Sequence, residues 1–115
     1  MKLLRPIILS IILFSPSAFG EDRGIMMFEF SESSCGVWAK SASNVEQRQL
    51  YLFWIRGFIS GYNAGVYQSG KKSAQVNRMP DNDTVALYVD KFCRDNPLDQ
   101  FIKAAFLLRD DLRNK

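Results

Sequence analysis

The chain has 115 residues, with 15 lysines or arginines against 12 aspartates or glutamates, a formal net charge of +3, two cysteines and no histidine. Without histidine it has no Ser-His-Asp or Cys-His arrangement to activate a nucleophile, and two cysteines are too few soft ligands for a zinc site. We therefore expect a protein that is not an enzyme and that binds no metal or other cofactor.

The first 20 residues have the pattern of a secretory signal peptide. Lys2 and Arg5 provide the positive start, residues 7–14 the apolar run, and residues 18–20 a small-x-small cleavage site. The run is shorter than the roughly 20 apolar residues of a spanning helix, so we expect an exported, periplasmic protein that does not span the membrane. Removing Lys2 and Arg5 leaves 13 basic and 12 acidic residues, and a net charge of +1 does not indicate nucleic-acid binding.

Residues 21–32 form a lead-in segment before the predicted helical domain over 33–115. The apolar residues at 26–30 fit either a loose arm or a short edge strand. A short helix is expected around 34–42.

The two cysteines, Cys35 and Cys93, are candidates for a disulfide. In an exported chain an even cysteine count favours this bond over two free thiols. Closing the loop between them would stabilise the fold by about 4 kcal/mol on the chain-entropy model. Trp38, three residues after Cys35, would shield the bond.

A long central helix is predicted over 44–69. Residues 43–46 match the S-x-x-E capping box, with Ser43 as the cap, and Gly70 is a typical helix terminator. At 100° per residue most of the helix is apolar, so it must be enclosed by the other helices or by a second subunit. The apolar arc consists of Leu50, Tyr51, Leu52, Trp54, Ile55, Phe58, Ile59, Tyr62 and Val66, and the polar stripe of Gln49, Arg56, Ser60, Asn63 and Tyr67.

Three glycines, Gly57, Gly61 and Gly65, recur every four residues within this helix. Each costs roughly 1 kcal/mol relative to alanine in a helix interior. Their spacing therefore predicts that another backbone packs closely against this side.

The aromatic residues of the central helix are candidates for a binding or dimer surface. Trp54 and Phe58 are expected in the core, because buried aromatics are the default at helical spacing, and Tyr62 belongs to the same run. Tyr67 lies on the polar stripe and is the stronger surface candidate.

Residues 68–82 form a long polar connection that carries Lys71, Lys72 and Arg78. It fits a mobile, solvated linker. It also fits a loop that contacts a partner, because recognition residues often lie on loops held by a rigid scaffold.

Two further helices complete the predicted fold. Asp83 is expected to cap a helix over 84–94, in which Asp90 and Arg94 stand four residues apart as a surface pair. Asn96-Pro97 is expected to open the last helix, with Asn96 as its cap. The core faces of the two helices are Val85, Tyr88, Val89 and Phe92, and then Leu98, Phe101, Ala105, Leu108 and Leu112.

The pattern predicts a small, single-domain, all-α bundle of about four helices around the long central one, with one disulfide. No feature favours a catalytic or ligand-binding site. The expected partners are proteins, including a second copy of the chain.

The segment over 85–101 has a distinctive order of residues, with a valine eight positions before the cysteine and an aromatic residue eight after it. The residues are Val85, Phe92, Cys93, Asn96, Pro97 and Phe101. This pattern resembles the C-terminal half of the HdeA/HdeB acid-stress chaperones, in which an aromatic-Cys followed by Asn-Pro opens the last helix. Upstream, a cysteine near the mature start and a long helix containing Gly57-Phe58 and Asn63 are similar more loosely. The resemblance implies an all-α fold with one disulfide, a dimer at neutral pH, and acid-released monomers that expose apolar surface to unfolding periplasmic clients.

The glycine stripe, the aromatic run over 54–62 and the length of the 68–82 loop differ from that family's pattern. In size and cysteine use the chain is also similar to periplasmic immunity proteins of the Rap/Tai type, which inhibit peptidoglycan amidases delivered by secretion systems. That resemblance implies that the 68–82 loop enters the active-site cleft of the enzyme. A subunit of an envelope assembly is a third interpretation.

Overall fold

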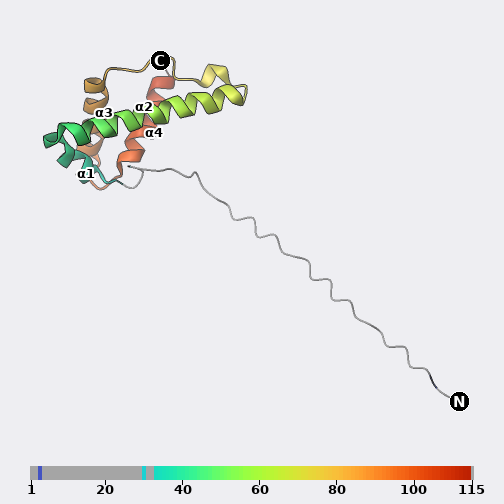
Figure 1. Cartoon of the computed structure of the whole chain (residues 1–115), viewed down its shortest axis with the longest axis horizontal. Coiled ribbons are helices and arrows are strands. Elements are labelled where there is room, and N and C mark those ends of the chain that lie inside the picture. Colours follow the sequence, from blue (N-terminus) through green and yellow to red (C-terminus); the bar gives the residue numbers. More distant parts are fainter. Residues whose placement is uncertain (1–2, 4–29, 31–32, 115) are drawn as a thin grey trace.

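The computed structural model describes residues 3, 30 and 33–114, so the predicted signal peptide, apart from Leu3, and nearly all of the lead-in segment lie outside the described residues. Within the described part the fold is all-α, as expected, with four α-helices, two 3-10 turns and no β-strand (Figure 1). The elements are α1 (Cys35–Lys40), η1 (Ser41–Ser43), α2 (Val45–Gln68), η2 (Lys72–Ala74), α3 (Asn82–Asp95) and α4 (Phe101–Arg113).

The long helix α2 is the axis of the domain. Figure 1 shows α1 at its N-terminal end, η2 at the opposite end, and α4 crossing it. Its C-terminus is closed by Gly70, whose φ of 79° is accessible to glycine, while the Lys71 amide donates to the Val66 carbonyl. This is a Schellman-type ending.

The start of α2 differs from the prediction by one residue. Asn44 is the cap, and its side-chain oxygen accepts from the Gln47 amide at 3.1 Å. Ser43 belongs to η1 and donates its hydroxyl to the Lys40 carbonyl instead. The expected Ser43 capping box is therefore wrong, because the preceding 3-10 turn already uses the serine.

The ends of α3 and α4 also correct the sequence prediction. Asp81, not Asp83, caps α3: its carboxylate accepts from the Thr84 amide at 2.8 Å. Asn96 ends α3 and does not start α4, since its backbone and side-chain amides both donate to the Phe92 carbonyl. After a turn, α4 begins at Phe101.

Leu98 therefore lies in the turn before α4 and is fully exposed, so its assignment to the core face was wrong. The turn is tied to the start of the domain by backbone bonds on either side of a Ser34–Gln100 bridge. The Cys35 amide donates to the Asp99 carbonyl, and the Phe101 amide donates to the Ser33 carbonyl, each at 2.9 Å. These bonds fix α1 beside the start of α4.

Aromatic rings form the centre of the core. Trp38 of α1, Tyr51 of α2 and Phe101 of α4 are almost completely buried, with ring centroids 4.8 to 5.5 Å apart. Phe30, the one described residue of the lead-in segment, places its ring 4.0 Å from that of Tyr51. Burial of such large rings, each about 150 to 250 Å², dominates the packing of a small domain.

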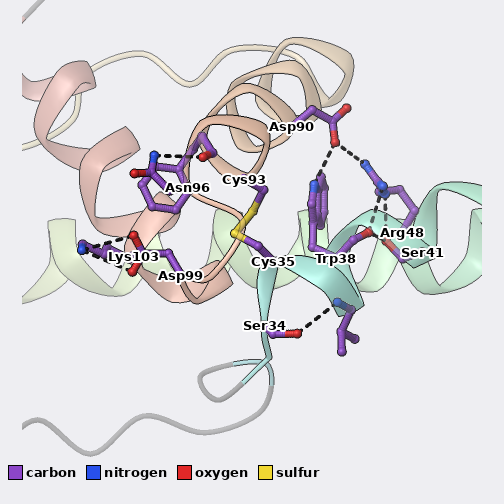
Figure 2. The surroundings of a disulfide bond; sticks show 12 residues. Ser34, Cys35, Trp38, Ser41, Arg48, Asp90, Cys93, Asn96, Asp99 and Lys103 are labelled. Carbon is purple, nitrogen blue, oxygen red and sulfur yellow. Dashed lines mark hydrogen bonds and ion pairs between the residues drawn. A yellow bond between two sulfur atoms is a disulfide. The ribbon is translucent and has the colours of Figure 1, made fainter.

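The Cys35–Cys93 disulfide is present, as predicted. It joins the first turn of α1 to the last turns of α3, with the Cα atoms 5.2 Å apart and both residues buried (Figure 2). The bond closes a separation of 58 residues, for which the chain-entropy model gives about 4 kcal/mol of stabilisation. Disulfides of this kind are typical of chains that fold in an oxidising compartment.

The expectation that α2 is enclosed holds for only one side of the helix. Tyr51, Leu52, Ile55 and Ile59 are buried, whereas Leu50 is 57% exposed and was wrongly placed in the core arc. The other helices cover a single face of α2. The opposite face is exposed along its length.

The predicted close backbone contact at the three glycines is likewise wrong within this chain. A Cβ atom built on Gly57, Gly61 or Gly65 would meet nothing within 4 Å outside its own helix. All three lie on the exposed side of α2.

Candidate partner-binding surface

The 68–82 connection is held against α2 by side chains from the polar stripe of that helix. Asn63 makes two bonds with Val76: its side-chain amide donates to the Val76 carbonyl, and its side-chain oxygen accepts from the Val76 amide, each at 2.8 Å. The Tyr62 hydroxyl donates to the Ala74 carbonyl at 2.8 Å. Val76 is itself buried. The loop is therefore attached to the scaffold at its centre, unlike a solvated linker.

A second attachment lies near the start of α3. The Arg56 guanidinium donates to the Pro80 carbonyl at 2.6 Å and to the Asn82 side-chain oxygen at 2.7 Å. Arg56 and Asn63 are seven residues apart, so they lie on the same side of α2. Together they determine the path of the segment between η2 and α3.

Three cations stand exposed on this attached backbone: Lys71, Lys72 and Arg78. Within the described part of the chain, none of the three forms an ion pair with a carboxylate. The Lys72 ammonium lies 4.7 Å from the centroid of the Tyr67 ring, and Tyr67 is 56% exposed. The structure thus brings Tyr67 and Lys72 into contact, and it places Lys71 and Arg78 on the same attached connection without showing a contact between them. We call residues 71–80 the cationic loop.

A groove adjoins the cationic loop where it passes the C-terminal end of α4. One part, of about 630 Å³, is lined by Asn77, Arg78, Pro80 and Leu112. The second part, of about 370 Å³, shares Pro80 and Leu112 and extends along α3 and α4. Arg78 therefore lies at the mouth of a partly apolar depression.

The second part of the groove contains a tyrosine–carboxylate pair. The Tyr88 hydroxyl donates to the Asp111 carboxylate at 2.6 Å. Burial raises the pKa of the Tyr88 phenol above its usual value, and the bond to Asp111 raises it further. The phenol is therefore neutral over the physiological range and acts as a donor.

Trp54 and Phe58 lie apart from this surface, between α2 and α4, whereas the neighbouring Tyr62 also reaches the loop through its hydroxyl bond to Ala74. The Trp54 and Phe58 rings stack with centroids 5.6 Å apart, and both residues pack half-buried against the core. The Arg109 guanidinium of α4 lies 5.2 Å from the Tyr62 ring centroid and 6.0 Å from that of Phe58. These aromatics join two helices.

A polar cluster near the disulfide was not predicted. Asp90 accepts from the Trp38 indole at 2.8 Å and from the Arg48 guanidinium at 3.2 Å (Figure 2). Arg48 also donates to Ser41 and to the Trp38 carbonyl, and its guanidinium carbon lies 3.6 Å from the Trp38 ring centroid. The expected Asp90–Arg94 pair is not formed, because Asp90 faces α1 and α2. The cluster joins α1, α2 and α3.

The attachment residues Arg56 and Asn63 were also missed as part of the site. They appeared in the sequence as members of a polar stripe on a mostly apolar helix. Isolated polar side chains on such a helix were the available signal, because a half-buried polar group requires a partner. The sequence did not reveal that the partner is the backbone of the 68–82 connection.

Among the described residues, no group of three or more Cys, His, Asp or Glu side chains is placed to hold a metal ion. No helix in that part of the chain is long and apolar enough to cross a membrane. Comparison of the chain with protein-family models, with curated proteins and with solved structures finds no match.

Proposed function

We propose that the protein is a periplasmic protein-binding domain of the immunity type, which inhibits a peptidoglycan amidase by inserting the cationic loop into its active-site cleft. The observation that carries the proposal is the attachment of this loop to α2 through Asn63 and Arg56, with Arg78 and Lys71 left exposed. The resemblance to Rap/Tai proteins supports the same function.

Attachment of the loop matters for affinity. A flexible loop loses conformational entropy when a partner orders it, at about 0.5 to 1.5 kcal/mol for each immobilised side chain, with an additional backbone cost. The backbone bonds at Ala74, Val76 and Pro80 meet much of this cost when the protein folds. Such a loop suits recognition of a folded partner at neutral pH.

Charge and shape define the kind of partner surface. The unpaired cations favour an acidic rim and accelerate the encounter, whereas the groove beside Arg78 accepts an apolar projection from the partner. The signal peptide predicted from the sequence and the disulfide agree with action in the periplasm, where peptidoglycan is cut.

The test first establishes whether a secretion-system amidase is encoded beside this gene, and then measures binding of that enzyme by calorimetry at about pH 7. We expect tight 1:1 binding per chain, and a loss of affinity of about a hundredfold or more in the double variant Lys71→Glu/Arg78→Glu. The matched control, Lys40→Glu/Arg94→Glu, reverses two exposed cations near the opposite end of α2 and should bind like the wild type. Failure of the wild-type protein to bind would remove the proposal.

The acid-chaperone type is a second candidate, and Asp90 is the observation that favours it. This carboxylate holds both Trp38 and Arg48, so loss of these two bonds would weaken the junction of α1, α2 and α3. Core surface exposed by this weakening, together with the already exposed Leu50 and Phe53, would form an apolar surface for unfolding clients. Protection of a model client from aggregation at about pH 2 to 3, and none at about pH 7, would establish this function; no protection at low pH would exclude it.

A further inference from the structure

The exposed face of α2 is apolar and has an unequal distribution of side-chain size. At 100° per residue, seven residues lie within about 40° of Gly57 around the helix axis, and all seven are exposed. The large apolar ones, Leu50 and Phe53, lie in its N-terminal half, 57% and 61% exposed. The small ones follow. In order, the seven are Glu46, Leu50, Phe53, Gly57, Gly61, Ala64 and Gln68.

This order is complementary to itself about Gly57. Leu50 and Ala64 lie seven residues on either side of Gly57, and Phe53 and Gly61 lie four residues on either side. An antiparallel pair of α2 helices related by a two-fold axis at Gly57 therefore places each large residue of one copy over small residues of the other. Among the described residues, no side chain fills the space beside Gly57 or Gly61.

Charge is complementary in the same arrangement. Glu46 is the charged residue on this face and lies at its N-terminal end; Lys72 lies just past the C-terminal end, with its ammonium over Tyr67. Viewed along the helix axis, Glu46 and Tyr67 are rotated away from Gly57 in the same direction, by about 20° and 80°. The two-fold axis leaves this direction unchanged in the second copy. Glu46 of each copy therefore faces the partner subunit's Lys72, once at each end of the interface.

The other two charges of α2 between Glu46 and Gln68 point elsewhere. Arg48 is bonded to Asp90 and Trp38, and Arg56 to Pro80 and Asn82. The centre of the face is thus free of charge, as the core of a homodimer interface should be.

We propose that this face binds a second copy of the chain, in an antiparallel α2–α2 dimer with its two-fold axis at Gly57. The contact is isologous, so that each copy offers the same patch and the assembly closes at two. Gly57 and Gly61 allow the backbones to approach closely, which accounts for these two helix-weakening residues on an exposed surface. The inference does not depend on the proposed function, because it uses the face of α2 and, of the cationic loop, only Lys72, whereas the binding test of that function changes Lys71 and Arg78.

Sedimentation equilibrium of the full mature protein tests the dimer. We expect a dimer of only micromolar affinity, since the strip is small for a protein interface. Gly61→Leu should give a monomer without loss of thermal stability, because the side chain has open space in the single chain but meets Phe53 of the partner subunit. Leu87→Ser, which removes another exposed leucine on α3, is the control and should leave the dimer intact.

Two measurements test the register. Glu46→Lys should weaken the dimer about tenfold, and Glu46→Lys/Lys72→Glu should restore it. A short bis-maleimide should cross-link Gly57→Cys chains efficiently but not Ala64→Cys chains, because two Ala64 residues lie about 21 Å apart along the helix axes. A monomer at all concentrations, a dimer unchanged by Gly61→Leu, or cross-linking of Ala64→Cys in preference to Gly57→Cys would each overturn the proposal.

Discussion

The attachment of the cationic loop by Asn63 gives the sharpest prediction. Asn63→Ala removes both bonds to Val76, whose backbone is buried and then has no partner in the loop. Two neutral hydrogen bonds contribute about 1 kcal/mol each, and an unsatisfied buried amide costs about 1 to 3 kcal/mol. We expect the free energy of local loop opening to fall by about 2 to 3 kcal/mol, which is less than the full sum because water replaces part of the lost hydrogen bonding.

The effect should be local, because alanine is a better helix former than asparagine in α2. Amide hydrogen exchange at Val76 is therefore the assay, since it reports the population of the open loop. The expected acceleration is about 30- to 150-fold, from tenfold per 1.36 kcal/mol.

The control is Asn77→Ala, in the same loop and exposed. It should leave exchange at Val76 unchanged, and both variants should keep the global unfolding transition near that of the wild type. Equal exchange at Val76 in Asn63→Ala and the wild type would refute the claim that this side chain holds the loop.

Two further predictions concern α3. Asp90→Ala should lower the free energy of unfolding, measured in guanidinium, by about 2 to 3 kcal/mol, because it leaves the buried Trp38 indole without an acceptor. The control Asp95→Ala breaks an exposed ion pair and should change this free energy by less than about 0.5 kcal/mol. Equal effects of the two variants would contradict the assigned role of Asp90. Because the pKa of Tyr88 is raised in the folded protein, the folded state keeps the phenolic proton at a pH at which the unfolded chain loses it. The contribution of Tyr88 to the free energy of unfolding is therefore fully present below about pH 10, the pKa of an unperturbed tyrosine, and is lost as the pH rises further. Urea unfolding from about pH 8 to 11 should show that decline in the wild type and a shallower one in Tyr88→Phe; parallel curves would show that Tyr88 is not responsible.

The elements that depend on local pattern were predictable from the sequence. The 3.6-residue periodicity located α2, and the terminator Gly70 ended it as expected. The disulfide was predicted from an even cysteine count in a chain that is expected to be exported. Both features rest on information within a short stretch of sequence or on composition alone.

The boundaries of α3 and α4 were not predictable in the same way, because Asn96 has two possible uses. An asparagine before a proline is a good helix cap, but here the Asn96 amide satisfies the carbonyl of Phe92 and ends the previous helix. Which use prevails depends on the turn being tied to residues 33–35, a tertiary interaction.

The candidate partner-binding surface could not be predicted from the sequence alone for the same reason. Lys71, Lys72 and Arg78 were recognised as a basic loop, but its attachment requires the polar stripe of α2 to face the returning chain at Val76 and Pro80. The groove also requires Leu112, which is far along the chain and meets Arg78 only after α4 has crossed α2. A single sequence does not specify such long-range contacts.

The most direct test of the account is inhibition of peptidoglycan hydrolysis. Turbidity of a peptidoglycan suspension is followed at about pH 7 with the cognate amidase that the proposed function requires, with and without an equimolar amount of this protein. We predict that the wild-type protein stops the loss of turbidity and that Lys71→Glu/Arg78→Glu does not, while Lys40→Glu/Arg94→Glu inhibits fully. Hydrolysis at the uninhibited rate in the presence of the wild-type protein, or full inhibition by the loop variant, would contradict the account.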